Sequence, residues 1–484
     1  MKFVIIKISF CFLTFLSQDG IAQGLFQTRL TQSGTESYGT SVVQSTDSNY
    51  VACGASNQSG FYTDAVITKL DTMGEVLWAK RYGGVFIDWV WEIINTLDGG
   101  FAIAGYTNSF GNGGYDFYLV KTDENGNAEW EKTYGGSDWD LAYALVQLPD
   151  SGFVLVGETY SYGSGNQDAY VVRTDKNGDT LWTKTFGTSG DEMFHSVCYA
   201  GNGSLVAAGV ANNGSTQNTD GYIVKFDTTG ALAWEEYKGT AAHDEIRSVK
   251  NHSSGHIMTM GYTDVNGVWD MQFMRIDTSS GFTLENFIDP VPNDDKGFDV
   301  CENSDNDYYF ALTTNSYGNV SDGTLDIHFL QFNSGFGYIY SGTNGLLGVN
   351  ETVYSIKNTF DDGFVAAGST SVSGNTVMYI MKYGKLIQSV NQPSNEELAT
   401  TSLEKINGIE YRIFPNPTND MLFIQGDSKI NKVNLTDLSG RLILSMNLEK
   451  NDLILYLGSL NSGFYLIEIT FEENYIITNK IFKQ

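Results

Sequence analysis

The sequence predicts an all-β fold, a seven-bladed β-propeller followed by a small β-sandwich, and three observations lead to this prediction. A unit of about 52 residues recurs along residues 24–386. Each unit contains four short strand-like runs separated by turns, without the 3.6-residue apolar period of an amphipathic helix. Seven copies of the unit fill the segment. Four-stranded units that close into a ring leave no long open sheet edge, which is the arrangement of a propeller.

The repeat is clearest at a tryptophan that recurs every 52 residues. The four copies are Trp78, Trp130, Trp182 and Trp234. Tryptophan makes up only 8 of 484 residues, so a fixed spacing of this kind indicates a tandem array. These side chains lie in alternating apolar strands, which favours packing between blades over a role in sugar binding.

Residues 140–187 illustrate the expected blade. The four predicted strands are residues 141–148, 153–159, 168–174 and 179–186. Asn177-Gly178 supplies the positive φ angles of a tight hairpin turn between the last two strands. The small and apolar residues of the second strand are typical of a strand that is buried on both faces.

The two ends of the repeat region are expected to meet. The seventh unit has a third strand at 377–383 but no fourth strand after it. Residues 25–31 look like a fourth strand without a blade of its own. We therefore expect this N-terminal strand to complete the last blade, since an open array would need capping repeats.

Residues 1–23 have the pattern of a secretory signal peptide. Lys2 and Lys7 precede a mostly apolar run at 8–16 and a small-residue site near Ala22. That run is too short to span a bilayer, and no later stretch reaches about 18 apolar residues, so no membrane span is expected in the mature chain.

The mature chain keeps three widely spaced cysteines in apolar runs, which predicts buried free thiols. They are Cys53, Cys198 and Cys301. Their spacing matches no zinc site.

A polar linker is expected at 387–409, followed by a small β-sandwich at 410–484 with seven alternating strand-like runs. Three turn motifs and a basic residue near the end occur in order there. They are Pro415-Asn416-Pro417, Gly440-Arg441, Gly463 with Tyr465, and Lys480.

This order resembles the type A C-terminal sorting domain of the type IX secretion system, found in Gram-negative Bacteroidetes. The repeat itself resembles β-propeller repeats of secreted and surface bacterial proteins. The resemblance implies that the type IX machinery exports the chain to the cell surface or the medium.

The formal net charge is −29, which argues against a nucleic-acid partner. An acid recurs at the start of each first strand: Glu36, Asp88, Asp140, Glu192, Asp244, Asp295 and Glu351. A second acid series opens the third strands. Because the strands of a blade alternate in direction, both series are expected on the face that carries the loops between second and third strands.

Three interpretations of the first acid series remain open. A ring of carboxylates could bind calcium. One acid at a fixed strand end is also a usual acceptor for loop amides, and a solvated charge is the third alternative.

Trp89, Trp91 and Trp139 depart from the repeat beside this face. They are candidate ligand contacts, with ordinary packing as the alternative.

Catalytic motifs are not evident in the sequence. The five histidines form no metal-binding spacing, and there is neither a Gly-x-Ser-x-Gly elbow nor a phosphate loop. The leading hypothesis is an exported, non-enzymatic module that binds polysaccharide or another surface macromolecule. A polysaccharide hydrolase or lyase with a site at the channel mouth is the alternative, and a structural or assembly component is a third.

Overall fold

The computed structural model divides the chain into two compact units, residues 1–390 and 391–484. In the first unit it describes residues 4–6, 24–31, 36–57, 62–212, 218–240, 242–265, 267–288, 294–315, 324–334, 338–344, 348–372 and 374–384. In the second it describes residues 404–406, 409–414, 421–437, 441–457, 460, 463–472 and 476–483. The described residues form strands and turns, with no α-helix among them.

The strands of the first unit repeat in sets of four. The first strands are β3 (Ser37–Gln44), β7 (Asp88–Asn95), β11 (Asp140–Gln147), β15 (Asp191–Gly201), β19 (Asp244–Asn251), β23 (Asp295–Glu302) and β27 (Thr352–Asn358). The second strands are β4 (Tyr50–Asn57), β8 (Phe101–Thr107), β12 (Phe153–Thr159), β16 (Ser204–Asn212), β20 (Ile257–Val265), β24 (Tyr308–Thr314) and β28 (Phe364–Val372). The third strands are β5 (Thr63–Leu70), β9 (Asp116–Thr122), β13 (Asp168–Thr174), β17 (Asp220–Asp227), β21 (Val268–Ile276), β25 (Asp326–Phe332) and β29 (Asn375–Tyr383). The fourth strands are β6 (Val76–Tyr82), β10 (Ala128–Tyr134), β14 (Thr180–Phe186), β18 (Leu232–Lys238), β22 (Thr283–Ile288) and β26 (Tyr338–Asn344).

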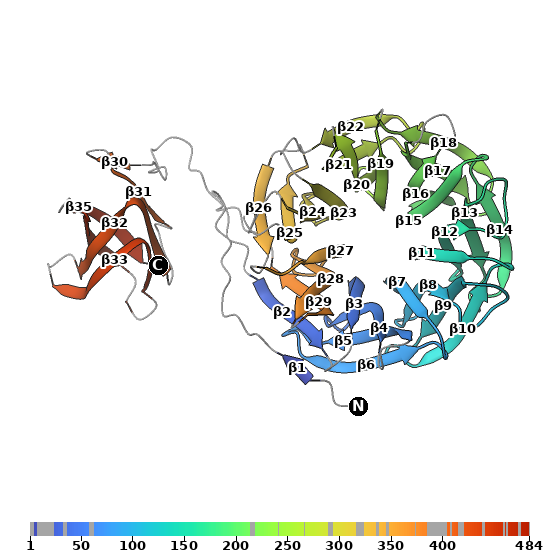
Figure 1. Cartoon of the computed structure of the whole chain (residues 1–484), viewed down its shortest axis with the longest axis horizontal. Helices are drawn as coiled ribbons and strands as arrows, with labels where there is room; N and C mark the ends of the chain where they lie inside the picture. Colours follow the sequence, from blue (N-terminus) through green and yellow to red (C-terminus); the bar gives the residue numbers. More distant parts are fainter. Residues whose placement is uncertain are drawn as a thin grey trace. The chain divides into compact units, whose positions relative to one another are not determined.

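Each set forms an antiparallel sheet of neighbouring strands. Figure 1 shows these sheets side by side around a common centre, with β7, β11 and β19 facing inward and β10, β14 and β18 at the rim. The predicted all-β, propeller-like assembly of four-stranded units is therefore confirmed. In the blade used as an example, β12 and β13 have the predicted bounds, while β11 begins at Asp140 and β14 at Thr180.

The N-terminal strand β2 (Gly24–Thr31) pairs antiparallel with β29, and it places Leu30 opposite Met378. A short strand, β1 (Val4–Ile6), pairs with the other edge of β2. The rest of the segment expected to be a signal peptide lies outside the described residues.

The apolar core lies between adjacent sheets, because the second and third strands are covered on both faces. Every residue of β12 and β13 is buried. The periodic tryptophans pack at the outer edge of these layers. A Cβ added to Gly178, whose φ is +78°, would stand 2.7 Å from the ring of Trp130. Glycine at this turn therefore lets the tryptophan of one sheet lie against the turn of the next.

Among the described residues of the first unit, Cys53, Cys198 and Cys301 are free and buried, as predicted. Burial raises the pKa of the Cys53 thiol to about 12, so the thiol stays protonated. The described residues include no helix with the length and apolar character that a membrane crossing requires.

The second unit forms one six-stranded sheet. Its strands are β30 (Glu404–Ile406), β31 (Ile409–Phe414), β32 (Met421–Asp437), β33 (Leu442–Tyr456), β34 (Gly463–Phe471) and β35 (Ile476–Lys483). Each of the long strands β32 and β33 combines two of the seven short strand-like runs that the sequence predicts. The pairing register shifts between Gln425 and Ile430, and both halves of β32 contribute to one apolar cluster. A separate second sheet, as expected for a sandwich, is not among the described strands.

The sequence motifs of this unit are only partly described. Pro415, Asn416, Pro417 and Gly440 lie outside the described residues. Arg441 is exposed just before β33, and buried Tyr465 lies in β34 with Gly463 at its start. Lys480 lies in β35, where its backbone is opposite Leu466.

Candidate functional site

The innermost strand of each sheet is interrupted at the same place by a register shift. In β7 the shift falls between Val90 and Glu92, and in β11 between Ala142 and Ala144. A β-bulge of this kind inserts one residue and turns its side chain away from the regular alternation. The inserted residues are Thr40, Trp91, Tyr143, His195, Arg247, Phe298 and Tyr354, and all seven line one cavity. We call these residues the bulge ring.

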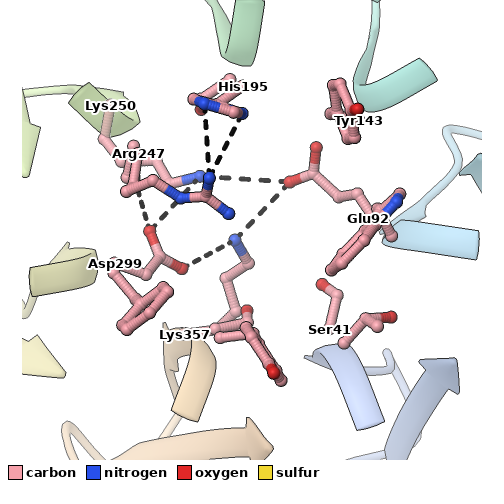
Figure 2. Close-up of a pocket in the computed structure, with 15 residues that line it drawn as sticks. Ser41, Glu92, Tyr143, His195, Arg247, Lys250, Asp299 and Lys357 are labelled. Atoms are coloured by element: carbon pink, nitrogen blue, oxygen red, sulfur yellow. Dashed lines mark hydrogen bonds and ion pairs between the residues drawn. The ribbon is translucent and has the colours of Figure 1, made fainter. Parts of the chain in front are cut away.

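The cavity holds about 540 Å³ of empty space, its open mouth included. Figure 2 shows the Lys357 ammonium reaching its centre between two carboxylates. Lys357 Nζ lies 3.7 Å from Glu92 Oε1 and 3.5 Å from Asp299 Oδ2. Lys250 Nζ lies 4.0 Å from the same Glu92 oxygen and 3.7 Å from Asp299 Oδ1. Two cations and two anions thus compensate each other at the centre of the first unit.

Asp299 and Lys357 are both charged at neutral pH. Burial opposes the charge of Asp299, but Lys250 and Lys357 outweigh it and hold the pKa of this carboxyl below its usual value. Burial likewise opposes the charge of Lys357, yet Asp299 and Glu92 raise the pKa of its ammonium. Asp299 also accepts hydrogen bonds from Ser248 Oγ at 2.5 Å and from the backbone N–H of Ile356 at 3.0 Å.

A second polar cluster contains Arg247 and His195, which also line the cavity. Arg247 Nη1 donates to Glu245 Oε1 at 2.7 Å, and His195 Nε2 lies 2.9 Å from the same oxygen. Burial and the charge of Arg247 lower the pKa of His195, which therefore stays neutral. Arg247 Nη1 is also 3.3 Å and 3.5 Å from the two ring nitrogens. His195 is thus held by neighbours on both nitrogens, an arrangement that fixes the ring rather than freeing a base.

The predicted ring of acids has a different environment. Six members are fully buried and Glu36 is half-buried. Asp140 accepts hydrogen bonds from the backbone N–H of Gly136 at 2.7 Å, from Ser161 Oγ at 2.8 Å, and from Thr159 Oγ1. Asp88 repeats this pattern in its own sheet. These two acids therefore hold the loops on each side of them, as in the interpretation of the series as loop-amide acceptors.

Burial raises the pKa of Asp88, Asp140 and Glu192 despite these hydrogen bonds. In the part of the chain that the structure describes, no three His, Cys, Asp or Glu side chains are grouped to hold a metal ion. Calcium binding by the series stays a prediction.

The three tryptophans singled out in the sequence occupy different places. Trp91 lines the cavity. Trp89 packs between Tyr38 and Trp91, with ring centroids 5.1 Å and 5.7 Å away, and does not line the cavity. Trp139 is 51% exposed at the end where β10 connects to β11.

Trp139 belongs to a larger set of exposed aromatic side chains that sequence reasoning missed. The members are Tyr62, Phe86, Phe110, Trp139, Tyr160 and Tyr162, each 41–51% exposed. All lie in loops that follow a second or a fourth strand, and these strand ends share one edge of their sheets because the strands are antiparallel. We call this set the aromatic arc. Its sequence signal is an aromatic residue in a glycine- and serine-rich loop.

The first unit is thus a repeat structure with exposed aromatic rings at one edge of its sheets and a polar cavity at their common centre. Residues 412–484 match the family described as secretion system C-terminal sorting domain. The second unit is therefore a type IX sorting domain, and the chain is secreted to the cell surface or exterior, as in Bacteroidetes.

Comparisons with known proteins also give similarities to other proteins. The chain is 28% identical over 199 residues to the regulatory protein FlaEY of Caulobacter vibrioides, a match that covers 36% of this chain and 20% of that protein. The chain thus spans about a fifth of that relative. Among solved structures, it is similar to a polysaccharide lyase, the PL25 ulvan lyase, with 12% identity, 74% and 92% of the two chains covered, and a TM-score of 0.45. It is also similar to Kuenenia stuttgartiensis hydrazine synthase, with 14% identity, 57% and 75% coverage, and a TM-score of 0.41.

Proposed function

We propose that this protein is an exported binding module that holds a polysaccharide on its aromatic arc. The observation that carries the proposal is the gathering of exposed rings at one end of neighbouring sheets. Exposed apolar side chains that gather in one region mark interaction sites. Aromatic rings present flat apolar faces with polar edges, which suit the C–H face and the hydroxyls of a sugar.

The geometry of the arc leaves ring faces available. Tyr62 and Phe86 meet edge to face at 79°, with centroids 5.7 Å apart. Trp139 and Tyr160 meet at 72°, with centroids 6.3 Å apart. A ring that contacts its neighbour by an edge still offers a face to a ligand, so several sugar units could stack along the arc.

The buried acids support the same function by fixing the loops. Gly136 and Ser161 both donate to Asp140, and they lie close in sequence to Trp139 and Tyr162. A loop held in its binding conformation before the ligand arrives loses less entropy on binding. In this proposal the acid series keeps the loops rigid, and the aromatic arc on these loops contacts the polysaccharide.

We further propose that the scaffold is a seven-bladed propeller closed by the N-terminal strand. The pairing of β2 with β29 supports closure. Ser37 of β3 also links the ends of the repeat: its Oγ donates to the carbonyl of Leu30 at 2.8 Å and accepts from the N–H of Met378 at 3.0 Å. Arg29 Nη2 lies 3.6 Å from Glu351 Oε1, which adds a charge contact across the same junction.

A polysaccharide hydrolase or lyase is the second candidate, because the cavity contains carboxylates, two tyrosines and a histidine. The contacts of these groups favour binding. Glu92 and Asp299 are paired with lysines, and Tyr143 donates to Glu158 Oε1 at 2.8 Å. Incubation with neutral and acidic polysaccharides, followed by assays for reducing ends and unsaturated uronic acids, tests this candidate; new ends would favour it.

Affinity electrophoresis of the full chain in gels containing polysaccharides tests the binding proposal. Phe110→Ala and Trp139→Ala should each lower the affinity obtained from the retardation about ten-fold. This corresponds to about 1–1.5 kcal/mol per aromatic contact. Phe360→Ala is the matched control, because Phe360 is 69% exposed at the opposite edge, between β27 and β28. The proposal is contradicted if no polysaccharide retards the chain, or if Phe360→Ala loses as much affinity as Phe110→Ala and Trp139→Ala. A chelator arm tests whether calcium takes part.

A further inference from the structure

One wall of the cavity contains buried polar atoms without partners. Ser41 Oγ, Ser355 Oγ and Trp91 Nε1 are buried and make no hydrogen bond to any described residue. Ser41 is 2% exposed and Ser355 is 4% exposed. All three residues line the cavity, on β3, β27 and β7. Leaving a buried donor unpaired costs about 1–3 kcal/mol, so three such atoms around one space point to a ligand.

The serines of the facing wall show that this is not a general property of the position. Ser41, Ser196, Ser248 and Ser355 all directly follow the inserted residue of a bulge. Ser196 Oγ accepts from the N–H of Val249 at 3.1 Å, and Ser248 Oγ donates to Asp299 Oδ1. The same residue type at the same bulge is therefore satisfied on one wall and unsatisfied on the other.

The donor set defines the chemistry of the ligand. An indole N–H only donates, and each lysine ammonium carries three donors. Lys357 Nζ makes a single hydrogen bond, of 3.5 Å to Asp299 Oδ2, among the described residues. The ligand must therefore supply acceptor oxygens. Tyr354 and Phe298, whose centroids are 5.6 Å apart, add apolar surface beside these donors.

The charges of the cavity favour a neutral ligand. Lys250 and Lys357 already lie between Glu92 and Asp299, and Arg247 is paired with Glu245. A bound anion would meet no uncompensated cation, and the net charge of −29 would repel it from a distance. A bound cation would face the lysine ammonium groups. Neutral hydroxyl oxygens avoid both penalties.

We propose that the cavity binds one neutral sugar unit of a glycan, with its hydroxyl oxygens on Ser41, Ser355 and Trp91. This inference rests on the proposed function and adds a second contact, at the centre of the first unit, to the aromatic arc. It assigns the ligand to the neutral glycans rather than to those rich in uronic acid or sulfate.

Calorimetric titration of the full chain with monosaccharides tests the inference. Glucose, galactose, mannose and xylose are the neutral probes, and glucuronate and galacturonate are the anionic ones. At least one neutral sugar should bind. Ser41→Ala with Ser355→Ala should weaken that binding at least ten-fold, and Trp91→Phe, which keeps a ring but removes the donor, should weaken it several-fold.

The variants separate a ligand contact from a structural role. Ser41→Ala and Ser355→Ala break no hydrogen bond and should melt at the wild-type temperature. Ser37→Ala, outside the cavity, is the control: it should melt at a lower temperature because it loses the hydrogen bonds with Leu30 and Met378, yet keep its sugar affinity. Equal affinity of the double variant and the wild type would overturn the inference, as would a preference for the uronates.

The outcome also distinguishes this inference from the proposed function. If polysaccharides are retarded through Phe110 and Trp139 but no neutral monosaccharide binds up to its solubility limit, the cavity is filled by water only and the inference fails alone. If neither polymers nor sugars bind, both fail.

Discussion

The seven innermost strands carry two rings of side chains that behave in opposite ways. The acid ring places Asp or Glu at the same position of every unit, whereas the bulge ring, three residues further along in most units, contains Thr, Trp, Tyr, His, Arg and Phe. Asp88, Asp140 and Asp244 each accept hydrogen bonds from the loop beside them, so these units use the acid in the same way. The bulge residues meet in one shared cavity, where each unit contributes a different part of a single site.

The largest expected effect concerns the centre of the bulge ring. Lys357→Met removes the cation that lies between Glu92 and Asp299, and it leaves the buried Asp299 and the partly buried Glu92 with Lys250 alone. Removing one partner of a buried ion pair costs about 3–5 kcal/mol. Because Lys250 still lies beside both carboxylates, we expect the free energy of unfolding to fall by about 3 kcal/mol. Thermal unfolding followed by circular dichroism measures it.

Lys132→Met is the control for that variant. Lys132 pairs with Asp179 at 2.9 Å on the surface, and such pairs contribute less than about 1 kcal/mol. Similar losses of stability in Lys357→Met and Lys132→Met would show that the ion pairs in the cavity contribute no more than a surface ion pair.

The next effect concerns the acid ring. Asp140→Ala removes the acceptor of three hydrogen bonds and should cost about 2–3 kcal/mol. Asp138→Ala, in the same loop, removes only an exposed acceptor and should stay within about 0.5 kcal/mol. A calcium-dependent rise in melting temperature that Asp140→Ala abolishes would instead identify the acid ring as a cation site.

The smallest expected effect concerns pH: the contributions of Asp140 and Asp299 to stability change with pH in opposite directions. The pKa of Asp140 is raised in the folded protein, so its contribution to stability falls as pH rises from about 3.9 through the folded value. The pKa of Asp299 is lowered, so its contribution is present above about 3.9 and is lost as pH falls through the folded value.

Unfolding of Asp140→Asn and Asp299→Asn between about pH 3 and pH 6 should show opposite slopes relative to wild type, each of order 1 kcal/mol. Slopes of the same sign would mean that the acid ring and the charged groups at the centre of the cavity do not differ in their electrostatics.

Local pattern predicted most strand positions, but it missed the geometry of the candidate site. Trp89 and Trp91 are two residues apart in β7, and regular alternation would place both on one face of the sheet. The bulge between Val90 and Glu92 breaks that alternation, so Trp91 lines the cavity while Trp89 packs beside it. A bulge depends on the register of the partner strand, which the sequence of one strand does not contain.

The sequence by itself determined the repeat, its four-stranded units, the recurring acids and the sorting motifs. These features follow from turn chemistry and apolar periodicity, which act over a few residues. Only the tertiary structure decided which side chains meet at the centre. Ser41 and Ser355 are more than 300 residues apart in the chain, yet they line one wall because the sheets converge there. The number of unpaired donors in that wall depends on every neighbour at once, and no local pattern encodes it.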